Sequence, residues 1–335
     1  MEIGNKKRLA VLVGCNYHNT QYELHGCIND VIQMREVLLS RFGFEPEDVE
    51  LLTDAPGSPI VPTGKNIMAA LGRMVGRAGQ GDVLFFHFSG HGTRIPSPRH
   101  GRPFWQDEAI VPSDFNLITD MDFRQLVNRL PKGSSFTILS DSCHSGCLID
   151  KEKEQIGPST VSSLGLRDGD GTAPFIPKAK SIPFDSLLHF LSTLTKINTS
   201  DIGTHLLQCF GADASLRFRL TREELDAPID PPLNPDEGIL LSGCQANETC
   251  VDVNPRSSAA SASGGGGAGK AYGAFSNAVQ TVLRENPRRR LSNREVVAAA
   301  RAVLEAQGLA QHPCLYCSDE NADAPFLWQP QIADV

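Results

Sequence analysis

Two short apolar runs that end abruptly in small and polar residues constrain this chain most. Residues 83–88 lead into a histidine between two glycines, His91, and residues 136–139 lead into the cysteine Cys143. Each run has the length of a buried strand. The carboxyl ends of parallel strands meet at one edge of an α/β sheet, where such folds place active sites. We therefore predict that the histidine and the cysteine meet there.

The two residues lie about 50 positions apart, the spacing known for the catalytic pair of caspases. A cysteine is a strong nucleophile as the thiolate, which a nearby imidazole favours. A turn histidine and an inert buried cysteine are the alternatives, but motif, spacing and strand-end position agree on a cysteine peptidase. We expect no catalytic role for His87, inside the first run, or for His144.

Strand-like and helix-like segments alternate along the chain. The expected strands are 9–15, 49–52, 83–88, 136–139 and 238–244, and the expected helices are 29–41, 66–77, 123–130, 274–283 and 293–307, with structure also at 184–188. This order predicts an α/β fold with a mostly parallel central sheet flanked by helices. Residues 150–180 have no sustained period and predict an exposed connector. A loop at about 255–270, which includes four consecutive glycines, is expected to be disordered.

Composition excludes several classes of function. The net charge is −8, from 31 Lys and Arg against 39 Asp and Glu, which argues against a nucleic-acid partner. No stretch reaches the roughly 18 apolar residues of a membrane span, and the first residues are too polar for a secretory signal peptide. Nine cysteines, an odd number, suit a reducing compartment. We expect a cytoplasmic or nuclear protein without a membrane partner.

The two motifs together resemble the metacaspases, a caspase-fold peptidase family of plants, fungi and protists. The resemblance continues in the segments 26–30, 107–112, 203–205 and 243–246. The lack of an N-terminal prodomain and the long connector resemble the plant type II branch, which is linked to programmed cell death. This implies a monomer with a caspase-like fold, a catalytic large-subunit-like region 1–150, a linker 151–181 and a small-subunit-like region 182–335.

An acidic pocket distinguishes this pattern from that of caspases. Asp141 lies two residues before the cysteine, so both side chains share a face if the strand continues. The resemblance adds Asp30 and Ser89 to the pocket. Two carboxylates would repel an aspartate and bind Arg or Lys. A helix cap at Asp30 and a plain strand end at Asp141 are the alternatives. We favour the pocket, and hence protein or peptide substrates cleaved after Arg or Lys.

The resemblance also implies a Cys–His dyad with an oxyanion site made by the backbone N–H groups of Gly92 and Cys143. It places Cys27 near the active centre as a candidate back-up thiol, although we expect a small apolar filler. Three potential metal ligands lie at 312–317, fewer than the four of a structural zinc site, so we expect no zinc there.

Calcium is where the chain departs from the family. Many metacaspases require calcium, and Asp107, Glu108 and Asp150 match parts of the acidic pattern that holds it. Residues 93–106 contain no acid and several arginines instead. Because calcium affinity rises with the number of anionic ligands, we expect at most a weak site and no required cofactor.

Basic residues in the connector predict activation by self-cleavage. The candidates are Lys151, Lys153, Arg167, Lys178 and Lys180. We place Lys180, followed by Ser181, first, because type II relatives have their basic cleavage residue there, and Arg167 second. Before cleavage the segment would block the cleft as a tethered pseudo-substrate at high effective concentration. An ordinary flexible linker is the alternative.

Two other classes of function remain open. A catalytically silent interaction module on a caspase fold would have no reason to retain His91, Cys143 and Asp141 together. A thiol redox protein would pair Cys143 with Cys147, but this spacing differs from the usual Cys-x-x-Cys motif.

Overall fold

The computed structural model describes residues 6–97, 106–143, 148, 153–157, 175–226, 238–245, 248–255 and 270–327. Several positions considered in the sequence analysis lie outside these ranges, namely His144, Cys147, Asp150, Lys151, Arg167 and residues 256–269 of the glycine-rich loop.

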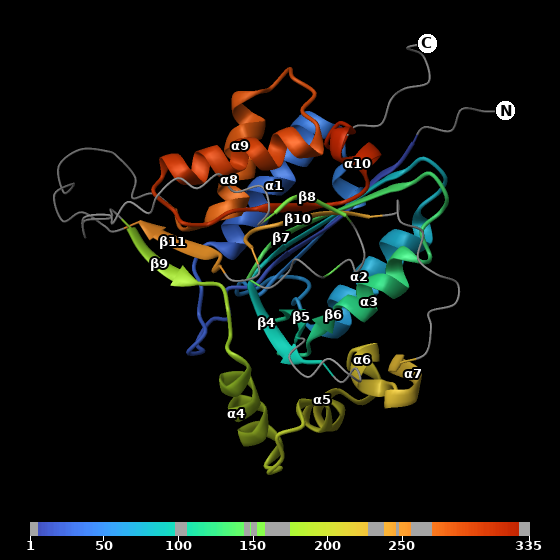
Figure 1. The fold of residues 1–335 in the computed structure, drawn as a ribbon, viewed down its shortest axis with the longest axis vertical. Helices are drawn as coiled ribbons and strands as arrows, with labels where there is room; N and C mark the ends of the chain where they lie inside the picture. The colour runs from blue at the N-terminus through green and yellow to red at the C-terminus, as the bar shows by residue number, and fades with distance from the viewer. Residues whose placement is uncertain are drawn as a thin grey trace.

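A seven-stranded sheet runs through the centre of the molecule in the order β2-β1-β3-β7-β10-β13-β8 (Figure 1). The five strands from β2 to β10 are parallel, whereas β13 and β8 run antiparallel to their neighbours. The strands are β1 (Arg8–Gly14), β2 (Val49–Thr53), β3 (Val83–Ser89), β7 (Ser135–Asp141), β8 (Glu154–Ile156), β10 (Ile239–Ser242) and β13 (Cys314–Tyr316). The predicted α/β fold with a mostly parallel sheet is confirmed.

Two three-stranded sheets flank the carboxyl edge of the central sheet. One has the order β4-β5-β6 and the other β12-β11-β9. Their strands are β4 (His91–Pro96), β5 (Gln106–Val111), β6 (Ile118–Thr119), β9 (Phe175–Ala179), β11 (Val251–Pro255) and β12 (Tyr272–Gly273).

The strands β8 and β9 contradict the prediction that the whole segment 150–180 is an exposed connector. Residues 154–156 pair with β13, and residues 175–179 pair with β11. Composition did not reveal these strands, because their partners lie far away in the sequence and strand formation depends strongly on tertiary context.

Helices cover both faces of the central sheet. In Figure 1, α1, α8 and α9 lie on one face and α2 and α3 on the other, while α4 to α7 extend from the edge. The helices are α1 (Cys27–Phe42), α2 (Gly64–Arg77), α3 (Asp120–Val127), α4 (Phe184–Thr195), α5 (Ile202–Phe210), α6 (Leu216–Arg219), α7 (Arg222–Asp226), α8 (Ala274–Glu285), α9 (Asn293–Ala306) and α10 (Asp319–Asp323).

Two apolar clusters hold these layers together. Alternate side chains of β1 point to opposite faces, so Val11 and Val13 join the cluster beside α2 and α3, whereas Leu12 joins the cluster beside α1, α8 and α9. Burial of each such side chain contributes about 1.5–3 kcal/mol. Because β10 pairs with β7, the second half of the chain completes the sheet that the first half begins.

Helix boundaries follow local signals in the sequence. Helix α1 buries one apolar face and ends at Gly43, whose φ of 67° is the left-handed conformation of many helix ends. Helix α9 begins with a capping box in which Ser292 and Glu295 satisfy each other's backbone N–H groups.

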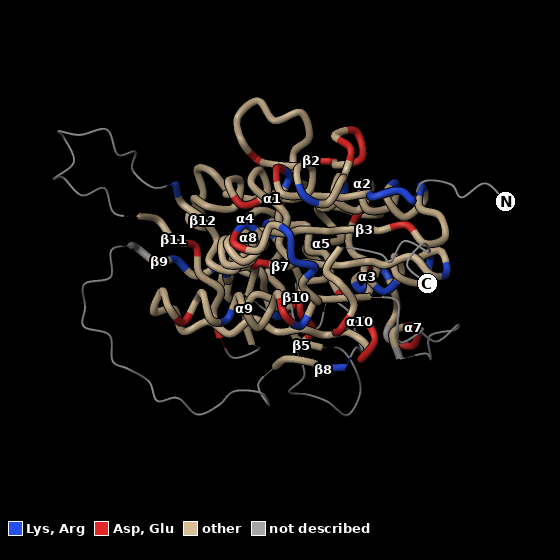
Figure 2. The backbone as a smooth tube through the Cα atoms, turned by 90° about the horizontal axis from the view of Figure 1, so that it is seen from above, with Lys and Arg blue, Asp and Glu red and all other residues tan. Residues whose placement is uncertain are grey.

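Charged residues of both signs are interspersed along the described backbone (Figure 2). Within the same residues, no helix combines the length and the apolar character that crossing a membrane requires.

Candidate active site

His91 and Cys143 meet because β3 and β7 pair in register and end together at Ser89 and Asp141. Both side chains are buried, and Cys143 interacts electrostatically with the imidazole. The imidazole Nε2 lies 2.7 Å from the carbonyl oxygen of Tyr22. Because a carbonyl only accepts, Nε2 carries the proton of the neutral ring. Among the described residues Nδ1 has no hydrogen-bond partner, so its lone pair is available to accept a proton.

The neutral ring follows from its environment. Burial lowers the pKa of His91 to about 4, and the hydrogen bond to Tyr22 together with the nearby Cys143 opposes the shift only in part. The thiol of Cys143 accepts a hydrogen bond from the backbone N–H of Cys250, with 3.0 Å between nitrogen and Sγ. This donor stabilises negative charge on the sulfur.

Tyr17 binds the backbone of His91 and packs against its ring. Its hydroxyl donates to the carbonyl of Val111 at 2.5 Å and accepts from the backbone N–H of His91 at 2.9 Å. The two rings lie 4.7 Å apart. The φ of Tyr17 is 52°, an uncommon conformation for this residue type, and the Asp54 carboxylate holds it by accepting from the Tyr17 N–H at 2.6 Å. Sequence reasoning missed Tyr17, because no motif marks it.

Lys180 fills the pocket formed by the predicted substrate-binding residues. Its Nζ lies 3.1 Å from Asp141 Oδ1 and 3.8 Å from Asp30 Oδ2, and it donates to Ser89 Oγ at 2.9 Å. All four side chains are buried. The structure thus brings Asp30, Ser89 and Asp141 together around the residue that the sequence analysis ranked first for self-cleavage.

The charges in the pocket balance one another. Burial by itself lowers the pKa of the Lys180 ammonium, but Asp141 and the other acids nearby raise it well above its usual value. Burial raises the pKa of Asp30 to about 8, against the opposing effects of Lys180 and Ser89. The Ser89 hydroxyl donates to Asp30 Oδ2 at 2.6 Å. The ammonium therefore pairs mainly with the Asp141 carboxylate.

The amino terminus of α8 completes the pocket. The N–H of Gly273 donates to Asp30 Oδ1 at 2.9 Å, and the N–H of Ser276 donates to Asp141 Oδ2 at 2.8 Å. Free N–H groups and the helix dipole favour negative charge at this position. A Cβ at Gly273 would overlap Asp141, Lys180 and Asp30. The sequence contains no motif that links α8 to these acids.

The backbone of Lys180 is bound as well. Its carbonyl oxygen accepts from the N–H of Gly92 at 3.0 Å and from the N–H of Cys143 at 3.2 Å. These are the two donors that the sequence analysis assigned to the oxyanion site. Only glycine fits at position 92, since a Cβ there would overlap the carbonyl of Cys143.

The residues around Lys180 lie as an added strand. Residues 175–179 pair antiparallel with β11, with Lys178 opposite Asp252. The N–H of Lys180 donates to Cys250 O at 3.0 Å, and beyond the next peptide bond the N–H of Ile182 donates to Gly92 O at 3.0 Å. Extended backbone pairing of this kind is a common mode of peptide recognition.

Cys27 lies on the pocket wall. Burial raises the pKa of its thiol, which also interacts with the Lys180 ammonium and with the Ser89 side chain. A protonated thiol is a poor nucleophile. Its environment therefore favours a filler of the pocket over a back-up nucleophile.

The described calcium candidates are paired with arginines. Asp107 Oδ2 accepts from Arg217 Nε at 2.8 Å, and Glu108 Oε1 lies 3.7 Å from Arg94 Nε. A guanidinium beside each carboxylate opposes cation binding. These residues do not fit a calcium site, and we derive no catalytic step through calcium.

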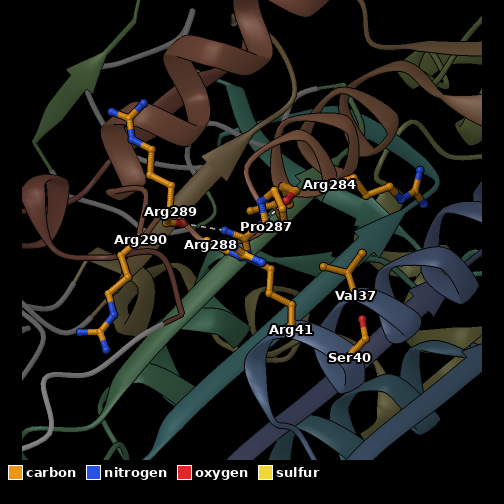
Figure 3. A pocket seen from close by; sticks show the side chains of 9 residues that line it. Val37, Ser40, Arg41, Arg284, Pro287, Arg288, Arg289 and Arg290 are labelled. Carbon is orange, nitrogen blue, oxygen red and sulfur yellow. Dashed lines mark hydrogen bonds between the residues drawn. The ribbon is translucent and has the colours of Figure 1, made fainter.

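A separate cavity of about 620 Å³ lies at the opposite end of α8 from the pocket (Figure 3). Five arginines are among the residues that line it, namely Arg41, Arg284, Arg288, Arg289 and Arg290. Arg41 donates to the carbonyls of Leu283 and Arg289, and cations near the carboxyl end of a helix are stabilising. We assign this cavity no part in peptide-bond cleavage.

Known proteins resemble this chain in sequence and in fold. Residues 7–152 match the peptidase C14 domain of metacaspases. The chain is 60% identical to metacaspase-9 of Arabidopsis thaliana, covering 97% of this chain and 98% of that protein. It is 37% identical to metacaspase-6 of the same plant, with coverages of 95% and 99%. The crystal structure of protein GSU0716 from Geobacter sulfurreducens superposes with a TM-score of 0.58 at 18% identity, covering 95% of this chain and 97% of that one, and shows the fold alone.

Proposed function

Because the chain belongs to the metacaspase family of cysteine peptidases, we propose an endopeptidase that cleaves proteins after Arg or Lys. It is made as a zymogen and is activated when it cuts its own chain between Lys180 and Ser181. The position of Lys180 carries this proposal. Its ammonium pairs with Asp141 while its carbonyl accepts from two backbone N–H groups.

The reaction follows from these contacts. The Sγ of Cys143 attacks the carbonyl carbon of Lys180, and the Nδ1 of His91 takes the thiol proton. The N–H groups that hold the carbonyl stabilise the negative charge that develops on its oxygen. The C–N bond to Ser181 then breaks, and the imidazolium gives its proton to the leaving nitrogen. Water hydrolyses the resulting thioester, with the imidazole as base.

The pocket explains the proposed specificity. A buried charge needs a paired partner. The Asp141 carboxylate supplies it for Lys, and Asp30 beside it offers a further acceptor for the forked guanidinium of Arg. An aspartate side chain would instead place a second negative charge beside Asp141. Uncharged side chains would leave Asp141 buried without its cation.

The same contacts make the uncut chain self-inhibited. The segment that ends at Lys180 fills the pocket with its last side chain, accepts hydrogen bonds from both oxyanion donors and pairs with the edge of β11. Because it is part of the chain, its effective concentration is high and a free peptide competes poorly. After cleavage the new carboxyl end must leave β11 before a substrate binds.

Each of the three proposed regions supplies residues to the site. Region 1–150 supplies His91, Cys143 and the side chains of the pocket, whereas region 182–335 supplies Cys250 and the amino terminus of α8. The linker 151–181 supplies the pseudo-substrate. A catalytically silent interaction module would require none of these alignments.

Mass spectrometry of the purified protein tests self-cleavage. We expect a new amino terminus at Ser181 in the wild type, an intact bond in Cys143→Ala, and an intact bond with very low peptidase activity in Lys180→Ala. Lys153→Ala is the matched control, because Lys153 belongs to the same connector but pairs with Asp319 at 2.7 Å. It should cut itself as the wild type does. An intact chain with full activity would contradict the proposal.

A further inference from the structure

Three thiols, including that of the nucleophile, form one buried cluster. The Sγ atoms of Cys143, Cys244 and Cys250 lie within 4.8 Å of one another, and their side chains are 0%, 3% and 0% exposed. No disulfide joins them. Among the described residues this is the one group of three or more metal-binding side chains that is close enough for a single ion. Peptide cleavage requires only one of the three.

The fold brings the thiols together from the ends of neighbouring strands. Cys143 follows β7, Cys244 follows β10 and Cys250 precedes β11, while β7 and β10 pair with Ser140 opposite Ser242. One contact shows how closely two of them pack. The N–H of Cys250 donates to Cys143 Sγ at 3.0 Å.

Gln311 forms hydrogen bonds with both ends of the loop that carries Cys244 and Cys250. Its Nε2 donates to Gly243 O at 2.8 Å, and its Oε1 accepts from the N–H of Val251 at 3.1 Å. Both ends of the loop are thereby tied to one buried side chain. The cluster is held by the scaffold before any ligand binds, which reduces the cost of binding one.

The spacing and chemistry of the cluster suit a soft metal ion. With a Zn–S bond of about 2.3 Å, sulfur atoms in a tetrahedral zinc site lie about 3.8 Å apart. The Sγ atoms here lie within 4.8 Å of one another, so each distance needs to shorten by no more than about 1 Å to reach that separation. Thiolates prefer Zn²⁺ and related soft cations over calcium or magnesium. Three protein ligands leave the fourth position to a water molecule.

We propose that Cys143, Cys244 and Cys250 form an inhibitory site for a thiophilic divalent cation such as Zn²⁺. Three sulfur–metal bonds form, and the protons of the three thiols are released to solvent. The lone pair that attacks the peptide carbonyl is then bound to the metal, so cleavage stops until the ion leaves. The proposal rests on the proposed role of Cys143 as the nucleophile.

The site differs from simple capture of a metal by the catalytic pair. An ion held by Cys143 and His91 alone would not depend on the other two cysteines. An ion held by the cluster requires both. Single substitutions at Cys244 and Cys250 therefore distinguish the two arrangements.

Cadmium binding tests the site without reference to activity. Cd²⁺ is titrated into the full-length chain under reducing conditions, and the ultraviolet band of cadmium–thiolate bonds is recorded. We expect one ion per chain in the wild type. Cys143→Ala, Cys244→Ala and Cys250→Ala should each lose about a third of the band and bind at least tenfold more weakly. The double variant Cys314→Ala with Cys317→Ala, which removes two buried thiols outside the cluster, should match the wild type.

Zinc inhibition of peptide cleavage gives the second readout, with each variant compared with its own rate without metal. We expect Cys244→Ala and Cys250→Ala to require at least tenfold more Zn²⁺ for half-inhibition. Inhibition at the wild-type concentration in both variants, or the absence of the cadmium band, would overturn the proposal. If instead the band appears but the wild type cleaves no Arg peptide, the proposed peptidase function fails and the metal site stands.

Discussion

Neutralising Asp141 tests the central contact of the pocket. In Asp141→Asn the side chain keeps its shape and an oxygen that accepts from the Ser276 N–H, but it loses the charge that faces the ammonium. That charge lies 3.1 Å from Lys180 Nζ, and both groups are 0% exposed. A free peptide with Arg or Lys at this position should meet the same carboxylate.

The expected loss of activity depends on the contacts that the ammonium keeps in Asp141→Asn. Removing one partner of a buried ion pair costs about 3–5 kcal/mol when nothing compensates. Here Asp30 Oδ2 stays at 3.8 Å and Ser89 Oγ at 2.9 Å from the ammonium. We therefore expect the smaller cost of a charged hydrogen bond, about 1.5–3 kcal/mol. This corresponds to a roughly ten- to hundredfold loss in kcat/KM.

The assay measures kcat/KM for an Arg-containing fluorogenic peptide, together with the rate at which Cys143 is alkylated. Alkylation should stay near the wild-type rate, because the substitution leaves the nucleophile and the histidine in place. Asp82→Asn is the matched control. Asp82 is also buried, but it lies at the amino-terminal end of β3, where it accepts from the Lys7 N–H at 2.8 Å.

Two results would refute the pocket assignment. One is cleavage of the Arg peptide by Asp141→Asn at the wild-type rate. The other is a wild-type preference for Asp before the cleaved bond.

Three further outcomes are expected. Tyr17→Phe removes the hydroxyl that holds the His91 N–H and should lower kcat about tenfold with little change in KM, since a buried unpaired group costs about 1–3 kcal/mol; Tyr22→Phe, whose backbone carbonyl is retained, should change kcat less. Burial lowers the pKa of His87 to about 3, whereas a histidine in the unfolded chain has a pKa of about 6.5. Below about pH 6.5 the unfolded chain therefore binds a proton that the folded chain does not, and the free energy of unfolding falls by up to about 1.4 kcal/mol per pH unit down to pH 3. Urea unfolding at pH 7 and pH 5 should show a weaker pH dependence in His87→Gln than in the wild type. Because Asp107 pairs with an arginine, a chelator and millimolar calcium should give similar peptidase rates, and activation by calcium from near zero would contradict this.

Local patterns in the sequence predicted most of the central layer. The strands at 83–88 and 136–139 and the helices at 29–41 and 66–77 each lie within an observed element, because periodic burial and helix ends depend on residues close in the chain. The short strands described outside the central sheet were not predicted, and neither were β8 and β13 within it. β9 and β11 contain proline and polar residues, and they form strands because β9 pairs with β11 and β11 also pairs with β12.

The residues of the candidate site were likewise predicted only in part. The sequence predicted His91, Cys143 and Asp141 because each lies in a motif at the end of a predicted strand, and it predicted Lys180 from the resemblance to type II relatives. It gave no sign that the amino terminus of α8 binds both pocket acids. Hydrogen bonds from backbone N–H groups leave no mark on residue identity, so a helix at residue 274 looks the same whether or not it faces Asp141.

By itself, then, the sequence determined the α/β class and predicted the proposed catalytic pair and the acidic residues of the pocket, since each prediction depends on residue type and short-range order. Tertiary structure alone decided that Lys180 lies between Asp141 and the oxyanion donors, that Tyr17 supports the histidine, and that Cys244 and Cys250 join the nucleophile. These contacts join residues that lie 37 to 107 positions apart in the chain. They arise from the pairing of strand ends at one sheet edge, where the burial of distant segments determines which side chains meet.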